Sequence, residues 1–112
     1  MNERVASLYS PTHPAVLSLL RQIYQSAKRA KIDISICGEI ASDLELTPLL
    51  LGLGYTTLSL APPMIPELKK VIRSVTMAQC RRIARKALTL DTDKQITSYL
   101  RSELQALLPE AD

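Results

Sequence analysis

The chain has 112 residues and a formal net charge of +3, with 46% hydrophobic and 22% charged residues. This balance is typical of one modest globular domain and argues against disorder. Its aromatic side chains are four tyrosines, with neither Phe nor Trp, so platforms that stack the bases of single-stranded nucleic acid are nearly absent. The two cysteines form neither a disulfide framework nor a zinc motif, and no stretch is apolar enough for a membrane span or secretory signal. We therefore expect a cytoplasmic protein with no membrane and no nucleic-acid partner.

An amphipathic helix is predicted over residues 14–30. Pro14 suits a first helical turn, and the apolar residues recur with a period near 3.6. The predicted apolar side consists of Val16, Leu19, Leu20, Ile23, Ala27 and Ala30. A strand is predicted over residues 32–37, because β-branched residues and a mostly apolar composition suit a buried parallel strand.

A second helix and a second strand follow. Asp43 is suited to N-cap a helix that continues through Leu51, and Gly52 and Gly54 bracket the end of that helix. The second strand is predicted over residues 56–60. Strand, helix and strand in this order form a βαβ unit, whose crossover is right-handed in nearly all proteins.

The last third of the chain shows helical patterns alone. An apolar stripe over residues 65–75 predicts one helix, Thr76 and Gln79 form a capping-box signature for the next, and Asp91 or Thr92 caps the last. Two strands do not make a self-sufficient parallel sheet, because both outer edges remain unpaired. The pattern therefore predicts the last portion of a larger α/β protein.

Cys37 ends the first predicted strand and is followed by Gly38. Ligand sites of parallel α/β proteins gather at the carboxyl ends of their strands, which makes Cys37 a candidate catalytic thiol. The alternative is a buried cysteine that acts as a small hydrophobe. Cys80 lies in the apolar stripe of its predicted helix, and we expect it in the core.

Three other features allow a functional and a structural interpretation. Glu39 and Asp43 could bind magnesium, but we favour a helix cap for Asp43 and a structural ion pair for Glu39. His13 could be mistaken for a phosphorylated histidine, but its place before Pro14 favours capping or packing. A basic cluster could bind an anion, but a solvated helix face is favoured, because its members fill positions that the apolar stripes leave free. The basic cluster consists of Lys69, Lys70, Arg73, Arg81, Arg82, Arg85 and Lys86.

Several motifs stand in order along the chain. They are Leu8-Tyr9, His13-Pro14-Ala15-Val16-Leu17, Cys37-Gly38-Glu39-Ile40-Ala41-Ser42-Asp43, Leu49-Leu50-Leu51-Gly52-Leu53-Gly54, Leu58-Ser59-Leu60, Ile65-Pro66 and Lys70-Val71-Ile72-Arg73. Together they resemble the C-terminal end of the phosphoenolpyruvate-utilising enzymes over about residues 2–88. The similarity is greatest to enzyme I, the phosphoenolpyruvate–protein phosphotransferase of the bacterial phosphotransferase system, or to its nitrogen-related paralogue.

The resemblance implies a transferase that moves the phosphoryl group of phosphoenolpyruvate, through a histidine of a separate domain, to a histidine-containing phosphocarrier protein and releases pyruvate. It also implies a homodimer, a role in sugar transport, and Mg²⁺ bound by residues upstream of this chain. The implied α/β fold is the C-terminal fragment of a (β/α)₈ TIM barrel, with two parallel strands, flanking helices and extra C-terminal helices. Residues 1–112 would form a single partial domain with a helical tail at about 76–108.

The position of Cys37 matches the proton donor of this family, which protonates enolpyruvate to give pyruvate. Cysteine thiols have a reference pKa of about 8.5, so a thiol as such can hold a proton at neutral pH and still release it. Gly38 would bind substrate by letting the backbone approach it closely. One departure is Ser42, which replaces a glycine usual in the family and would be strained if its φ were positive.

The family's other site residues precede the segment present here, so we expect the isolated chain to be inactive. The alternative is a non-catalytic helical module, built on a barrel remnant, that self-associates through its exposed edges and apolar helix faces. A basic nucleic-acid binder ranks last.

Overall fold

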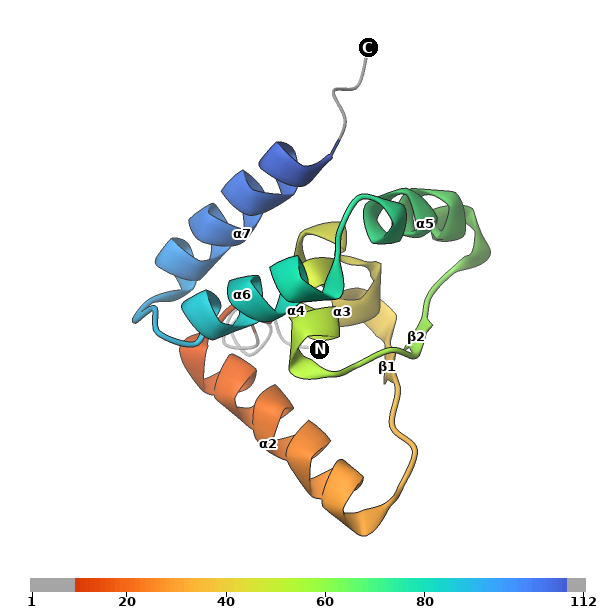
Figure 1. Ribbon diagram of the computed structural model, residues 1–112, viewed down its shortest axis with the longest axis vertical. Coiled ribbons are helices and arrows are strands. Elements are labelled where there is room, and N and C mark those ends of the chain that lie inside the picture. The colour runs from red at the N-terminus through yellow and green to blue at the C-terminus, as the bar shows by residue number, and fades with distance from the viewer. Residues whose placement is uncertain (1–9, 109–112) are drawn as a thin grey trace, which may run out of the picture.

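The computed structural model describes residues 10–108 (Figure 1), so Leu8 and Tyr9 of the first motif lie outside the described part. The described chain is a mostly helical α/β fold, which confirms the predicted class. Its elements are α2 (Pro14–Ala30), β1 (Ile36–Cys37), α3 (Gly38–Ser42), the 3₁₀ turn η1 (Leu44–Leu46), α4 (Thr47–Leu53), β2 (Leu58–Ser59), the 3₁₀ turn η2 (Pro62–Met64), α5 (Ile65–Arg73), α6 (Met77–Ala87) and α7 (Asp93–Leu107).

The two strands pair in parallel, as predicted, but they are much shorter than the sequence pattern indicates. Ile36 lies opposite Leu58, and Cys37 lies opposite Ser59. The expectation of a buried strand over residues 32–37 is wrong, because Ile32 is 64% exposed and Cys37 is exposed as well. A β-branched run becomes a strand only where a neighbouring chain supplies hydrogen bonds, and here β2 supplies them over two residues alone.

The side of α2 that faces the core agrees with the prediction only in part: Leu20 and Val16 of the predicted side pack in the core. Leu17 and Leu20 are buried, whereas Leu19 and Ile23 are 54% and 41% exposed. Helix α2 carries apolar residues on more than one side, so the 3.6-residue period of its sequence does not show which side is buried. The residues of α2 that pack in the core are Leu17 and Leu20, which are buried, and Val16 and Tyr24, which are partly buried.

Helix α4 forms the centre of the core. It begins at Thr47 rather than directly after Asp43, because Asp43 caps the short turn η1 instead. A Cβ atom at Gly52 would lie 2.0 Å from the backbone oxygen of Cys80, so α4 and α6 approach each other at this glycine. The core cluster consists of Leu17, Leu20, Leu46, Leu49, Leu50, Leu53, Tyr55, Ile83, Ala84, Ala87, Ile96 and Leu100.

The last two helices begin with reciprocal side-chain caps. The capping box of Thr76 and Gln79 is confirmed at the start of α6, and Thr92, rather than Asp91, caps α7 together with Gln95. Each box satisfies backbone N–H groups that a helix start leaves without partners. The sequence therefore predicts the start of α6 correctly and places the start of α7 within two adjacent residues.

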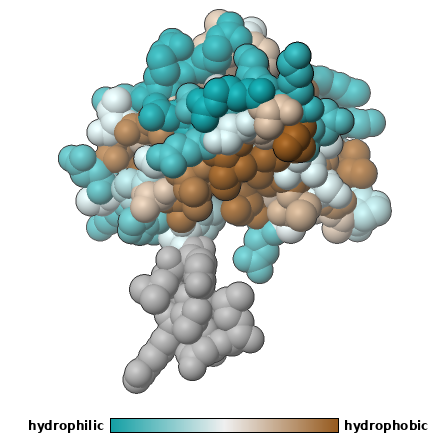
Figure 2. Space-filling view, turned by 90° about the horizontal axis from the view of Figure 1, so that it is seen from below, coloured by the Kyte–Doolittle hydropathy of each residue, from teal (hydrophilic) through white to brown (hydrophobic). Residues whose placement is uncertain are grey.

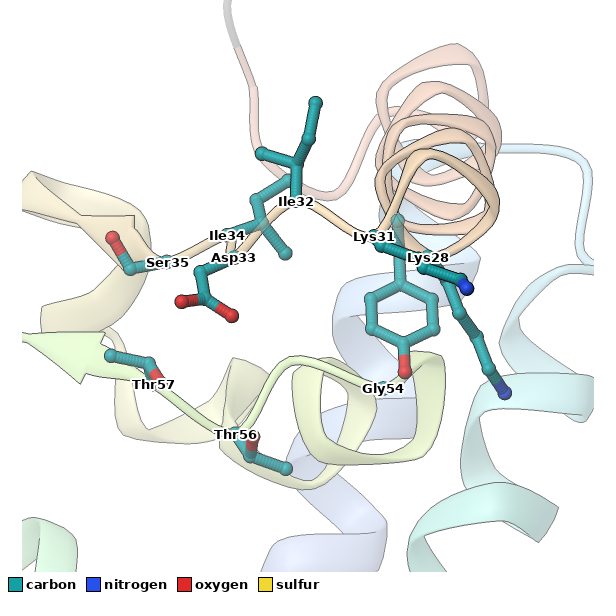
Figure 3. A pocket seen from close by; sticks show the side chains of 10 residues that line it. Lys28, Lys31, Ile32, Asp33, Ile34, Ser35, Gly54, Thr56 and Thr57 are labelled. Atoms are coloured by element: carbon teal, nitrogen blue, oxygen red, sulfur yellow. The ribbon is translucent and has the colours of Figure 1, made fainter.

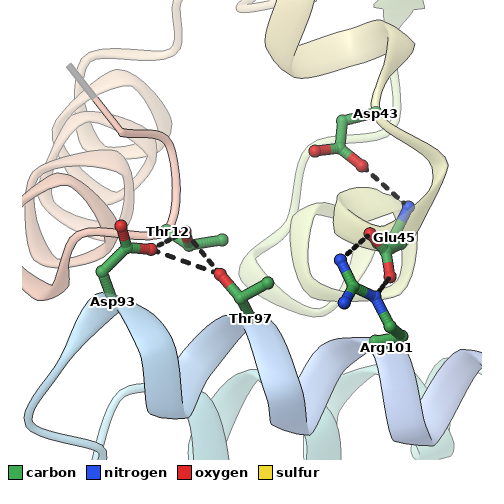
Figure 4. Close-up of polar contacts among 6 residues, drawn as sticks. All are labelled: Thr12, Asp43, Glu45, Asp93, Thr97 and Arg101. Carbon is green, nitrogen blue, oxygen red and sulfur yellow. Dashed lines mark hydrogen bonds and ion pairs between the residues drawn. The ribbon is translucent and has the colours of Figure 1, made fainter. Parts of the chain in front are cut away.

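Polar contacts fasten α7 to distant parts of the chain (Figure 4). Thr12, in the turn before α2, donates a hydrogen bond to Asp93 and lies 3.0 Å from the hydroxyl of Thr97. One turn further along the same face of α7, the Nε atom of Arg101 lies 2.8 Å from an Oε2 atom of Glu45 in η1. Helix α7 thus bridges the segments on either side of β1.

The surface includes an apolar area. Figure 2 shows apolar side chains gathered in the middle of one face, with hydrophilic groups around them. None of the described helices is both long and apolar enough to cross a membrane. The large apolar side chains that are exposed are Leu19, Ile23, Ile32, Ile65, Ile72 and Met77.

Candidate active site

The Cys37 side chain lies at the carboxyl end of β1, where the sequence predicts it. Cys37 is exposed and has extended backbone angles, φ −137° and ψ 177°. It immediately precedes α3, and it makes no side-chain capping hydrogen bond there. The thiol is therefore free to meet a molecule at this end of the strand pair, and the alternative of a buried hydrophobic cysteine is wrong for this position.

Gly38 and Ser42 occupy the two ends of α3. Gly38 has φ +72°, in the left-handed region that favours glycine, and a Cβ atom at this position would meet nothing within 4 Å. The glycine is thus required by the backbone conformation and not by crowding. Ser42 has helical backbone, and its hydroxyl donates to the Gly38 carbonyl at 3.0 Å. The strain considered for Ser42 does not occur.

The carboxylates near Cys37 hold the loop together. An Oδ1 atom of Asp43 accepts a hydrogen bond from the Glu45 backbone N–H at 3.1 Å, which confirms the capping interpretation. Burial raises the pKa of the Asp43 carboxyl. Glu45 pairs with Arg101 (Figure 4), whereas Glu39 is exposed and makes no ion pair within residues 10–108, so the ion pair expected for it is absent there.

The described residues do not fit a magnesium site. Across residues 10–108, no three His, Cys, Asp or Glu side chains come together in a way that could hold a metal ion. Asp43 and Glu45 already have partners. Residues 10–108 therefore offer no set of ligands with which a metal could take part in the chemistry.

Two further predictions for single residues are confirmed. His13 caps α2, and its Nδ1 atom accepts a hydrogen bond from the Ala15 backbone N–H at 3.0 Å. Cys80 is fully buried in α6, and burial raises the pKa of its thiol. The two cysteines thus differ sharply in exposure, which makes Cys80 an internal comparison for Cys37.

The basic cluster lies on solvent-exposed positions of α5 and α6, as the structural interpretation predicts. Arg82 forms a two-pronged pair with Glu103 of α7, at 2.9 and 3.1 Å. This hydrogen bonding lowers the pKa of Glu103. The other members have no carboxylate within salt-bridge distance among the described residues.

A large open cavity lies on the opposite side of the strand pair (Figure 3). It has a volume of about 810 Å³, and its lining includes Lys28 and Lys31 from the end of α2. The remaining walls come from Tyr24, Gly54 and residues 32–35 and 56–57. The last two segments precede β1 and β2, so the cavity is at the amino ends of the parallel strands. Sequence analysis missed it because the cavity forms between two stretches that are distant in the chain, within residues 24–35 and 54–57.

Comparison with known proteins identifies the family. Residues 1–77 match the family described as PEP-utilising enzyme, PEP-binding domain. This match covers more than half of the chain and includes Cys37, Gly38, both strands and α5. The chain belongs to the PEP-utilising enzymes, which confirms the resemblance seen in its motifs.

Several curated relatives match most of the chain. It is 38% identical over 96 residues to a phosphoenolpyruvate-protein phosphotransferase of Mycoplasma genitalium, covering 86% of this chain and 17% of that protein. It is 37% identical over 111 residues to multiphosphoryl transfer protein 1 of Escherichia coli, covering 99% of this chain and 13% of that protein. A phosphoenolpyruvate-protein phosphotransferase of Buchnera aphidicola is 34% identical over 99 residues, or 88% of this chain and 17% of that protein. The chain thus spans less than a fifth of the length of these relatives.

Proposed function

We propose that this chain is the C-terminal part of a phosphoenolpyruvate–protein phosphotransferase and that Cys37 is its proton donor. The observation that carries the proposal is the exposed thiol at the carboxyl end of β1, next to a glycine with positive φ. The family match and the names of the relatives support it. In the whole enzyme, β1 and β2 would be two strands of a (β/α)₈ barrel, and residues 1–112 would be a C-terminal portion of that domain.

The proposed step is a single proton transfer. When the phosphoryl group of phosphoenolpyruvate leaves for a histidine of another domain, an enolate of pyruvate remains. The S–H bond of Cys37 breaks, a C–H bond forms at the methylene carbon, and the negative charge moves from the enolate to sulfur. Gly38 would border the substrate, because the space that a Cβ atom would occupy at this residue is open. The original proton stays on the methyl group of pyruvate, and a second proton, from solvent, later restores the thiol.

Magnesium and the groups that hold the phosphate belong, in this proposal, to upstream parts of the enzyme. A proton donor alone cannot stabilise the charge that moves in phosphoryl transfer, because that task needs cationic groups around the phosphate. The isolated chain is therefore inactive. Incubation with phosphoenolpyruvate, Mg²⁺ and a phosphocarrier protein tests this, and any pyruvate release above the blank would contradict the proposal.

A chimera tests the role of Cys37 directly. The segment of the Mycoplasma genitalium relative that aligns with this chain is replaced by it, and pyruvate release is followed with a lactate dehydrogenase assay. Cys37→Ala should lower turnover by about 10²- to 10⁴-fold, the usual contribution of a positioned general acid. Cys80→Ala, at the buried cysteine, is the matched control and should retain activity. Equal turnover in the two variants would remove Cys37 from the mechanism.

The partners follow from the same proposal. They are phosphoenolpyruvate, a histidine-containing phosphocarrier protein and a second copy of the enzyme, in the cytoplasm. The exposed side chains of Leu19 and Ile23 on α2, and of Ile65 and Ile72 on α5, are apolar surface that self-association could cover. Sedimentation of the chimera at several concentrations tests this, and a monomer at every concentration would contradict it.

A further inference from the structure

A second cavity, of about 350 Å³, lies between α2 and α6 with α4 as its floor. Four positions of α2 line it at i, i+3, i+4 and i+7, and three positions of α6 together with its C-cap Leu88 repeat that spacing. Positions with this spacing share one face of a helix. The face on α2 begins at Arg21, and the face on α6 begins at Arg81. Neither Cys37 nor Gly38 contributes to it, so this groove is separate from the proposed catalytic thiol.

The groove collects positive charge from both helices. Arg21 and Lys28 line it from α2, Arg81 and Arg85 line it from α6, and no carboxylate residue is among the lining residues. Within residues 10–108, none of these four cations lies within salt-bridge distance of a carboxylate. Arg82, the neighbour of Arg81, faces α7 and is neutralised by Glu103. Cations that face one another without a carboxylate repel, and a multivalent anion between them would relieve that repulsion.

The inner part of the groove is apolar and held in place. Tyr24 packs edge-on against Tyr55, with ring centroids 5.5 Å apart, and a Cβ atom at Gly54 would lie 2.3 Å from the Tyr24 ring. Leu53 and Leu88 complete this wall. A groove with a fixed aromatic wall and cations around it matches a ligand that joins an apolar ring to several negative charges. Its volume is at the lower end of the range for small-molecule pockets.

We propose that the groove between α2 and α6 binds a small organic polyphosphate. The guanidinium groups of Arg21, Arg81 and Arg85 suit phosphate, because they donate paired N–H groups in a planar fork. Lys28 adds a fourth positive charge at the end of α2. The apolar part of the ligand lies against Tyr24, which distinguishes this site from a general attraction to anions.

Calorimetric titration of the full chain at low salt tests the proposal, with ATP and inorganic tripolyphosphate as the two probes. Both should bind, and ATP should bind more tightly because its ring adds contact with the apolar wall. The double variant Arg81→Gln/Arg85→Gln should weaken ATP binding at least about tenfold, since one charge-assisted hydrogen bond is worth about that factor. The matched control Lys69→Gln/Lys70→Gln removes the same charge from α5, outside the groove, and should change binding less than about twofold.

The outcomes of this titration distinguish binding in the groove from a general attraction of anions to the charged surface. No binding of either probe, or equal weakening in the two double variants, would overturn the proposal, because only general surface charge would then be at work. Equal affinity for ATP and tripolyphosphate would overturn the assignment to an organic phosphate. Cys37→Ala should leave ATP binding unchanged. The binding experiment therefore tests the groove independently of the catalytic role proposed for Cys37.

Discussion

Replacing Gly52 by alanine probes how closely α4 packs against α6. The added Cβ atom would lie 2.0 Å from the backbone oxygen and 2.6 Å from the backbone carbon of Cys80, and 2.9 Å from the Cβ atom of Ala84. Real Cβ atoms almost never approach other heavy atoms within 3.0 Å. Two of these three atoms belong to the backbone of α6, so a side-chain rotation cannot relieve the contact. Helix α6 must move away from α4.

The size of the effect follows from two opposing contributions. Extra volume in a well-packed core costs about 1–3 kcal/mol, and the upper end applies here because backbone atoms block the new methyl group. Alanine inside a helix regains about 0.5–1 kcal/mol over glycine. The expected net loss in the free energy of unfolding is therefore about 2 kcal/mol. In a domain of this size each kcal/mol lowers Tm by about 4–8 °C, so the variant should melt about 8–16 °C lower.

Urea unfolding of the parent chain and the variant, followed by far-UV circular dichroism, measures this difference. The midpoint should fall while the slope of the transition is unchanged, because the surface exposed on unfolding is nearly the same. Ser18→Ala, on an exposed position of α2, is the control for helix propensity and should stay within about 0.5 kcal/mol of the parent. A Gly52→Ala chain as stable as the parent would refute the close packing of α4 on α6.

Three further predictions concern the thiols, a buried hydroxyl and the response to acid. Cys37 should react rapidly with Ellman's reagent in the native chain and Cys80 only on unfolding, and a single slow phase for both would contradict their different exposure. Tyr55→Phe should cost about 1–2 kcal/mol in urea unfolding, because the Tyr55 hydroxyl donates to the buried carbonyl of Leu20 at 2.6 Å, and an unchanged midpoint would contradict this. Threonine and serine hydroxyls lower the pKa of Asp93, so its stabilising effect is present above its unfolded pKa of about 3.9 and is lost as pH falls through the lower folded pKa. Asp93→Asn should therefore flatten the part of the stability curve below about pH 4, and identical acid curves would contradict the contact.

The features that the sequence predicts correctly are those with local causes. The caps made by His13, Asp43 and Thr76 each involve backbone N–H groups within three residues, so a short window of sequence contains all the participants. The position of Cys37 at the end of a strand follows from its place between a β-branched run and Gly38. In each case the neighbours in sequence are also the neighbours in space.

The features that sequence analysis gets wrong or misses depend on distant partners. The extent of β1 depends on how many residues of β2 it meets, which the run at 32–37 does not encode. The five-residue helix α3 was not predicted, because it begins at a glycine with positive φ and no helix signal precedes it. The hydrogen bond from Thr12 to Asp93 joins residues 81 positions apart, and short polar side chains in a turn do not reveal such a pairing.

The position of Cys37 in the fold depends more on the helical segments that follow it than on the pairing of β1 with β2. Because β1 and β2 have two residues each, few hydrogen bonds between them fix the position of Cys37. The chain continues from β1 into α3 and then into η1. The turn η1 packs against α7, where Leu46 and Leu100 belong to the same buried cluster and Glu45 pairs with Arg101. An exposed ion pair contributes at most about 1 kcal/mol, so the buried leucines supply most of this attachment. Helix α7 lies beyond the family match, which ends at residue 77, and yet it supports the segment that follows the candidate proton donor.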